Sequence, residues 1–237
     1  MNLLSIAQNV AYEVGFEPPA FLYGNTDATA RQILALCNRE GKILARRHNW
    51  TMLQKEYDIT TVGGQENYDL PDDFDRLIDN TLWDRSAYQS MRGPLSPQQW
   101  QQKKSGLIGS VGIKRNFRIK RGADIINQIY IDPVPPINGD ALILEYVSQN
   151  WVRNLAGTQT SNVWQDDSDE SILPENLVIM GVVWRFLLAK GLDYAMALQE
   201  YEREVSQAIA RDGGMPKLNL QSNCMQDIAL NLPEANF

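Results

Sequence analysis

Hydrophobic residues at the start of the chain recur every three or four positions. They are Leu3, Ile6, Ala7, Val10 and Val14, and Gly15 follows directly. Residues at this spacing share one face of a helix, and glycine is common just beyond a helix C-terminus. The pattern therefore predicts a first helix that ends at Gly15.

A second hydrophobic stripe predicts a longer helix that starts near Thr26 or Asp27 and ends near Asn49. Thr and Asp are both good N-cap residues. The stripe consists of Ala30, Ile33, Leu34, Cys37 and Leu44. Gly41 lies inside this helix, where glycine costs roughly 1 kcal/mol relative to alanine. Close packing on a neighbouring helix is one reason to tolerate it.

Between Trp50 and Trp151 the hydrophobic period changes to two, which is typical of strands. Alternation is clear in residues 57–61 and 113–120, and segments 129–131 and 141–147 are rich in Ile, Leu and Val. Gly63-Gly64 is a turn signal. The pattern predicts a β-rich insert built of hairpins. Ser96-Pro97 predicts the start of one short helix over residues 98–104.

The polar segment 152–171 ends in Asp166-Asp167-Ser168-Asp169-Glu170 and is predicted to be an exposed loop. A group of carboxylates suggests a metal site. The pattern of a calcium-binding loop, with its glycine and distal glutamate, is however absent. We therefore expect no metal there.

Two more helices are predicted after this loop. Residues 175–190 follow Pro174 and are hydrophobic on nearly every face, which indicates a helix buried on most sides and ended by Gly191. The next helix runs from Asp193 to about Arg211, before Gly213-Gly214. It carries one hydrophobic stripe, formed by Tyr194, Leu198, Tyr201, Val205, Ala208 and Ile209.

Residues 215–237 are too apolar for a solvated tail and too irregular for a helix. They either pack on their own domain or form an arm that docks on another subunit, and we favour the arm. The hydrophobic residues that would make the contact are Leu218, Leu220, Met225, Ile228, Leu230, Leu232 and Phe237.

Together these elements predict an α+β protein with three parts. Residues 1–50 and 172–214 form a four-helix bundle, with two helices from each end of the chain. Residues 51–171 form the β-rich insert, and residues 215–237 form the extended arm. A chain of 237 residues with 43% hydrophobic residues and six Trp can bury a substantial core.

The net charge of −7 argues against a protein that grips nucleic acid over a broad face. The charge is uneven, because residues 86–123 contain basic side chains and no acidic one. This stretch is either a solvated strand face or an electrostatic patch that meets an acidic partner or passing DNA. The candidate patch residues are Lys103, Lys104, Lys114, Arg115, Arg118, Lys120 and Arg121.

The sequence contains no motif that indicates catalysis or a cofactor. His48 is the only histidine, so it can form neither a zinc-binding His pair nor a Cys/His dyad, and it is expected to be a charge partner at a helix end. Cys37 lies on a hydrophobic stripe and is expected to be inert. Gly106, Gly109 and Gly112 lack the Gly-Lys-Ser/Thr of a phosphate-binding loop and are expected in a flexible β-loop.

The sequence also shows neither a signal peptide nor a membrane span. The start of the chain has no basic segment, and the longest apolar run contains Arg185 and is too short to cross a bilayer. We expect a soluble protein that stays inside the cell where it is made.

Three stretches resemble the head-to-tail adaptor (connector) proteins of tailed bacteriophages, including the tail tubular proteins of podophages. The first is 68–74 with Trp83-Asp84. The second is 131–135, leading into 144–148 and Trp151. The third runs from 173–175 through Trp184-Arg185-Phe186 to 190–195. The resemblance covers roughly residues 3–214.

The resemblance implies a structural virion protein at the head–tail junction, present in the host cytoplasm during assembly. Copies would form a ring, a dodecamer in this family, between the portal and the tail or nozzle protein, with the helices as ring wall. The arm would insert between portal subunits, and DNA would pass through the bore without being read.

Three alternatives to the adaptor remain. The first is another neck or baseplate component, and the second is a DNA-binding accessory factor that uses residues 92–121. The third is a hydrolase that acts on the host envelope, which would need a carboxylate pair in a cleft.

Overall fold

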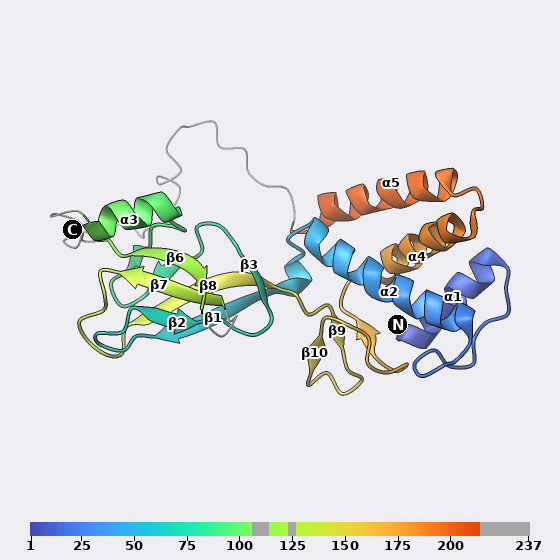
Figure 1. The fold of residues 1–237 in the computed structure, drawn as a ribbon, viewed down its shortest axis with the longest axis horizontal. Helices are drawn as coiled ribbons and strands as arrows, with labels where there is room; N and C mark the ends of the chain where they lie inside the picture. Colours follow the sequence, from blue (N-terminus) through green and yellow to red (C-terminus); the bar gives the residue numbers. More distant parts are fainter. Residues whose placement is uncertain (106–113, 123–126, 214–237) are drawn as a thin grey trace, which may run out of the picture.

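The computed structural model describes residues 1–105, 114–122 and 127–213. Figure 1 shows most of the helices gathered at one end of the molecule and most of the strands at the other. The helices are α1 (Leu3–Val14), α2 (Ala28–Arg47), α3 (Pro97–Ser105), α4 (Glu175–Lys190) and α5 (Ala195–Arg211), with a 3-10 turn at Thr51–Leu53. The mixed α+β fold class is confirmed.

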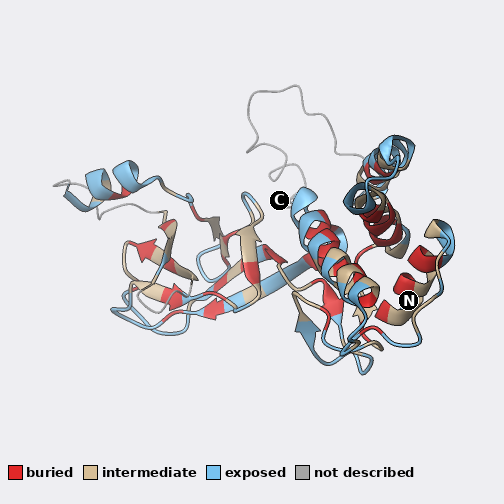
Figure 2. Ribbon diagram, turned by 45° about the vertical axis from the view of Figure 1, so that its right-hand side comes forward, coloured by how far each residue is buried: buried red, intermediate tan, exposed pale blue. Residues whose placement is uncertain are grey.

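Helix α4 lies at the centre of the helical region, which we define as α1, α2, α4, α5 and residues 148–174. It contacts α1, α2 and α5. Its buried residues include Val178, Val182 and Phe186, and Figure 2 shows buried residues along α4 and on one face of both α1 and α2. The expectation of burial on most sides is correct except at the C-terminal end, where Leu188 is 47% exposed.

The predicted positions of all five helices are confirmed within a few residues. Asp27 is the N-cap of α2, where its carboxylate accepts from the backbone N–H groups of Thr29 and Ala30. Gly15 and Gly191 end α1 and α4 in the left-handed conformation, with φ of 85° and 72°. Glycine adopts this conformation without steric penalty.

Gly41 is required by close packing, but its partner is not the neighbouring helix that the sequence suggested. A Cβ atom at this position would lie 2.2 Å from the indole of Trp151. Trp151 comes from the segment between two strands and is fully buried against α2. A large side chain therefore occupies the space that Gly41 leaves open.

The prediction of an exposed loop over residues 152–171 holds only in part, since residues 155–159 are exposed and outside any strand. The segment forms a small sheet of β9 (Val152–Arg153), β10 (Thr160–Ser161) and β11 (Glu170–Ser171), in the order β10-β9-β11. Trp164 is buried in the same core as the helices. Strands of two residues contain too little periodicity to be recognised in a sequence.

The strands before residue 148, together with α3, form the β-region. They are β1 (Gln54–Thr60), β2 (Asn67–Asp69), β3 (Phe74–Leu77), β4 (Trp83–Asp84), β5 (Gln89–Ser90), β6 (Asn116–Arg121), β7 (Asn127–Asp132) and β8 (Ala141–Ser148). One sheet has the order β1-β8-β4-β5, with β3 also paired to β8, and the other has the order β2-β7-β6.

All the strand pairs of the β-region are antiparallel, and the two sheets share one hydrophobic core. Ile59 and Leu144 contribute to this core from the first sheet, and Phe117 and Ile129 from the second. Antiparallel strands are therefore present in the part of the chain where the sequence predicted them. The prediction of hairpins holds for β4 with β5 and for β6 with β7, but β1 pairs with β8 from far along the chain.

Candidate functional site

The basic stretch that the sequence singled out lies in the β-region, on α3 and β6. Two of its lysines form ion pairs with acidic residues of the same chain. Lys103 Nζ lies 2.8 Å from Asp132 Oδ2, and Lys104 Nζ lies 2.9 Å from Glu66 Oε1 and 3.1 Å from Asp132 Oδ1. Burial alone would raise the pKa of Asp132, but the hydrogen bonds from the two lysines lower it below its ordinary value. These lysines therefore fix α3 on the strands.

Arg115 has the same structural role at the start of β6. Its guanidinium lies 2.8 Å from Asp84 Oδ2 and also pairs with Asp140. The side chains of Asp84 and Arg115 are only 4% and 15% exposed. Arg115 thus connects β4, β6 and the segment before β8, and it is not free to bind a partner.

The other four predicted patch residues are Lys114, Arg118, Lys120 and Arg121, of which only Arg121 is exposed. Phe117 and Ile119 of β6 face the core, so Arg118 and Lys120 lie on the opposite face of the strand. Lys120 Nζ lies 4.1 Å from the ring centre of Tyr130 and 5.1 Å from that of Trp100. Burial, and then the charge of Arg118, lower the pKa of Lys120.

Arg121 is exposed at the end of β6, and Lys114 is partly buried before its start. We define Arg118, Lys120 and Arg121 as the basic surface. The predicted arm residues, from Leu218 to Phe237, lie outside the described residues, as do Gly106, Gly109 and Gly112.

The first sheet presents a contrasting surface on its outer side. Glu56, Asp58 and Glu145 are exposed there, on β1 and β8. They surround Trp83 and Ile143, which are directly opposite each other on β4 and β8 and only partly buried. We define these five residues as the acidic face.

The acidic face contains a shallow groove of about 370 Å³. Trp83, Ile143, Glu56 and Glu145 line it, together with Arg85, whose Nη2 lies 2.7 Å from Glu56 Oε1. The groove thus has hydrophobic residues at its centre and a mainly negative rim, a combination that suits a basic protein surface better than a nucleic acid.

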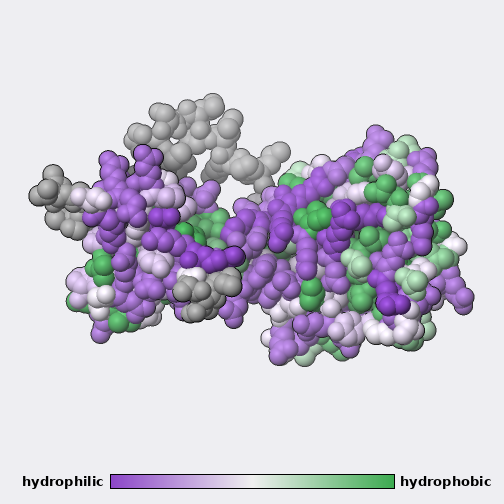
Figure 3. All heavy atoms as spheres, in the orientation of Figure 1, coloured by the Kyte–Doolittle hydropathy of each residue, from purple (hydrophilic) through white to green (hydrophobic). Residues whose placement is uncertain are grey.

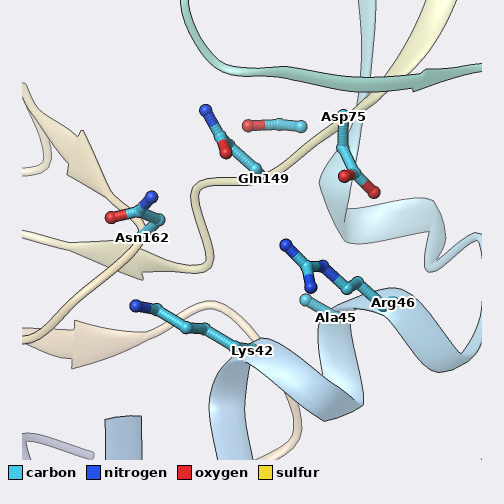
Figure 4. Close-up of a pocket in the computed structure, with 7 residues that line it drawn as sticks. Lys42, Ala45, Arg46, Asp75, Gln149 and Asn162 are labelled. Carbon is cyan, nitrogen blue, oxygen red and sulfur yellow. The ribbon is translucent and has the colours of Figure 1, made fainter. Parts of the chain in front are cut away.

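The two regions meet at a small polar pocket of about 100 Å³ (Figure 4). Lys42 and Arg46 reach it from α2, and Asp75, Gln149 and Asn162 from the strands and loops opposite. It is too small for a ligand of ordinary size, since ligand pockets usually enclose about 300 Å³ or more.

Arg76 of β3 connects the two regions close to this pocket. Its guanidinium donates to the carbonyl oxygen of His48 at 2.7 Å, to that of Ala45 at 3.3 Å and to Asn49 Oδ1 at 2.7 Å. Carbonyl groups at a helix C-terminus lack partners within the helix, and a cation there is favourable. Arg76 therefore caps α2 from the β-region.

Asp73 lies in stretch 68–74, which carries part of the family resemblance, and its side chain has a structural role. It accepts hydrogen bonds from Lys55 Nζ at 2.6 Å, Ser148 Oγ at 2.7 Å and Tyr146 Oη at 2.8 Å. Burial would raise the pKa of Asp73, but these three donors lower it below its ordinary value. The ring of Phe74 stacks on that of Tyr146. This stretch supports the fold, not a reaction.

Sequence reasoning missed a buried charge in the helical region. Glu40 of α2 is fully buried and accepts from Arg185 Nε of α4, at 2.5 Å, and from the Tyr201 hydroxyl of α5. Burial, and then the charge of Glu40, raise the pKa of Tyr201. A signal was present, because Glu40 lies between Cys37 and Leu44 on the hydrophobic stripe.

His48 and Cys37 have structural surroundings. His48 follows the last turn of α2, and its Nε2 lies 3.3 Å from Asp212 Oδ2 at the end of α5. It therefore lies at a helix end, as expected. Cys37 is fully buried, which raises the pKa of its thiol to about 12 and keeps the thiol protonated and inert.

The carboxylates of segment 166–170 cap backbone groups. Asp167 accepts from the N–H groups of Leu22 and Tyr23, and Asp169 Oδ2 from those of Gln165 and Asp166. Within the part of the chain that the structure describes, no three His, Cys, Asp or Glu side chains are grouped to hold a metal ion. None of the helices described here has the length and hydrophobicity to cross a membrane.

Hydrophobic residues are exposed around the turn between α4 and α5. Leu188 is 47% exposed, Leu192 52% and Met196 74%. Tyr12 of α1, a helix that also packs on α4, is 66% exposed. Figure 3 shows hydrophobic side chains at the surface of the helical region, among hydrophilic ones. Such a group of exposed hydrophobic residues is typical of a protein–protein contact.

One protein family has a sequence model that matches this chain. The family is described as SU10 adaptor protein, and the match extends over residues 1–221. It includes both regions of the structure and all the stretches that carry the resemblance. No curated protein matches the chain.

Proposed function

Since the chain belongs to the SU10 adaptor protein family and is thus a structural adaptor of a phage, we propose that it is the ring subunit that joins the portal to the tail. In this proposal the ring continues the DNA channel, and DNA passes through it without being read. The subunit catalyses no reaction, and its place is the virion, at the head–tail junction.

The match over residues 1–221 is the observation that carries this proposal. The exposed hydrophobic residues around the α4–α5 turn support it, because they would be covered in an assembly. We propose that residues 1–50 and 172–214 act as a four-helix bundle that forms the wall of a dodecameric ring. The β-rich insert, residues 51–171, then faces the tail or nozzle protein.

The C-terminal arm, residues 215–237, would make the contact with the portal. Seven hydrophobic residues are available for it, from Leu218 to Phe237. Ordering such a segment costs about 1–2 kcal/mol per residue in backbone entropy, so it contributes affinity only when its partner is present. We propose that the subunit is monomeric in the host cytoplasm until it meets the portal.

Electron microscopy of the full chain mixed with its cognate portal protein tests the proposal. The expected result is a ring of this protein on one end of the portal. Binding to the tail protein without any binding to the portal would instead favour a neck or baseplate component. A stable ring in light scattering of the isolated chain would contradict the proposed monomer.

Two variants of the arm sharpen this experiment. Ile228→Asp with Leu230→Asp should abolish ring formation on the portal, because charges replace the proposed hydrophobic contacts. Asn223→Asp with Asn231→Asp adds the same charge to the same segment without removing a hydrophobic residue, and it should assemble normally. Equal assembly by both variants would exclude the arm as the portal contact.

A further inference from the structure

We propose that the acidic face of one subunit binds the basic surface of the next copy in the ring. The inference rests on the proposed function, because it assigns one contact between neighbouring subunits. The acidic face consists of Glu56, Asp58, Glu145, Trp83 and Ile143. The basic surface consists of Arg118, Lys120 and Arg121.

The acidic face has the composition of a contact site. Trp83 and Ile143 are partly exposed although both lie in the interior of a sheet face, on strands β4 and β8. Exposed acidic residues of β1 and β8 surround them, and Glu56 is directly opposite Glu145. Two carboxylates at a paired position repel each other, and a cation from a partner would relieve this repulsion.

Arg85 relieves the repulsion between Glu56 and Glu145 only in part. Arg85 pairs with Glu56, but both of these side chains are more than half exposed. Asp58 and Glu145 have no partner among the ion pairs that the described residues form. The centre of the face is thus hydrophobic and its rim retains a net negative charge.

The basic surface provides the complementary charge. Arg118 and Lys120 lie on the outward side of β6, and Arg121 is exposed at the end of that strand. Arg118 and Lys120 are close enough for the charge of Arg118 to lower the pKa of Lys120. An acidic partner would stabilise both cations, just as a cationic partner would stabilise the acidic face.

The positions of the two surfaces allow a contact that repeats around a ring. The acidic face is on the outward side of the first sheet. Arg118 and Lys120 are on the outward side of the second sheet, beside α3, so these groups point away from each other, whereas Arg121 is exposed at the end of β6. One subunit can therefore contact two neighbours, one through each surface, which is the heterologous geometry of a closed ring. A twofold dimer through either surface would bring like charges together, which is unfavourable.

Charge reversal tests the proposal on the full chain mixed with the portal. Asp58→Arg with Glu145→Arg reverses the acidic face, and Arg118→Glu with Arg121→Glu reverses the basic surface. Each pair alone should raise the concentration needed for ring formation about tenfold or more. All four changes in one chain should restore assembly, because every contact then again joins a positive surface to a negative one.

The matched control swaps the charges of an ion pair outside both surfaces and outside the proposed ring wall. Arg153→Glu with Glu170→Arg, between β9 and β11, should assemble like the unmodified protein, and thermal melts of all variants establish that they fold. Normal rings from both reversed pairs would overturn the inference while leaving the proposed function intact. Failure of the four-residue variant to restore assembly would also overturn it.

Disulfide trapping decides the inference even if the portal does not bind the chain. Two proteins carry Asp58→Cys and Arg121→Cys separately, each with Cys224→Ser; the remaining Cys37 is buried. Mild oxidation of their concentrated mixture should give a heterodimer that neither protein forms alone. A mixture that gives no more dimer than the separate proteins would contradict the proposed contact.

Discussion

At the scale of single residues, removal of the buried Glu40 carboxylate should lower the stability of the protein. Glu40→Ala would leave Arg185, which is 11% exposed, without its carboxylate partner. Removing one partner of a buried ion pair usually costs about 3–5 kcal/mol. We expect this loss in the free energy of unfolding, measured by urea denaturation at pH 7.

Glu202→Ala is the control, since Glu202 pairs with Arg47 near the surface and should contribute at most about 1 kcal/mol. If Glu40→Ala were no more destabilising than Glu202→Ala, the buried ion pair would not stabilise the helical region.

The carboxylate of Asp73 predicts a pH dependence of stability. Its pKa is lower in the folded chain than the ordinary value of about 3.9 for an unfolded Asp, so ionisation favours folding. The contribution is complete above about pH 5 and is lost as the pH falls through the lowered folded value. Asp73→Asn should therefore destabilise by about 1–2 kcal/mol at pH 7, since it loses hydrogen bonds to a charged group.

The same variant should differ less from the unmodified protein as the pH falls from 5 toward 3. Urea titrations of both proteins at several pH values provide the measurement. A difference that stays constant between pH 7 and pH 3 would mean that ionisation of Asp73 does not contribute.

At the scale of elements, the packing of Trp151 on α2 should reverse the usual effect of a Gly→Ala substitution inside a helix. Gly→Ala inside a helix normally stabilises by about 1 kcal/mol. At Gly41 the new methyl group would overlap the buried indole of Trp151, so we expect a loss of about 1–3 kcal/mol instead. Thermal and urea denaturation measure it. The control is Lys42→Ala, at the exposed next position, which should change stability by less than about 0.5 kcal/mol. If Gly41→Ala stabilised the protein, the close packing of Trp151 on α2 would be contradicted.

The same elements show which parts of the fold a sequence can predict. Helices of 12 to 20 residues such as α1 and α2 repeat their hydrophobic pattern several times, so their positions could be predicted within a few residues. Strands of two to four residues, such as β4 and β9, contain at most one repeat of the pattern. The carboxylates near Asp167 raised the question of a metal site, because nothing in the sequence shows that Asp167 caps the backbone N–H groups of Leu22 and Tyr23.

At the scale of the whole molecule, the charge of the basic stretch could be predicted but its pairing could not. Lys103, Lys104 and Arg115 have acidic partners that lie between 25 and 38 positions away along the chain. Only the fold brings them together. Neutralising Arg115 in a test of DNA binding would therefore disturb the β-region itself, whereas Arg118 and Arg121 are suitable targets.

The whole molecule also depends on how its two regions are joined, and Arg76 is the residue that we expect to fix their relative orientation. It is on β3 but donates to the C-terminal carbonyl groups of α2. Arg76→Ala would remove both bonds and the contact to Asn49 while leaving the two hydrophobic cores unchanged. The regions should then sample a wider range of orientations.

Distances between spin labels on Gln98 of α3 and Arg203 of α5 measure this range, since both positions are exposed. The distance distribution should broaden in Arg76→Ala and should remain narrow in the control Arg85→Ala, which removes an exposed ion pair within the β-region. In the proposed function the subunit contacts the portal at one end and the tail at the other, which requires a fixed relation between its regions. Arg76→Ala should therefore also form rings on the portal that bind the tail protein poorly, and an unchanged distribution would show that other contacts fix the orientation.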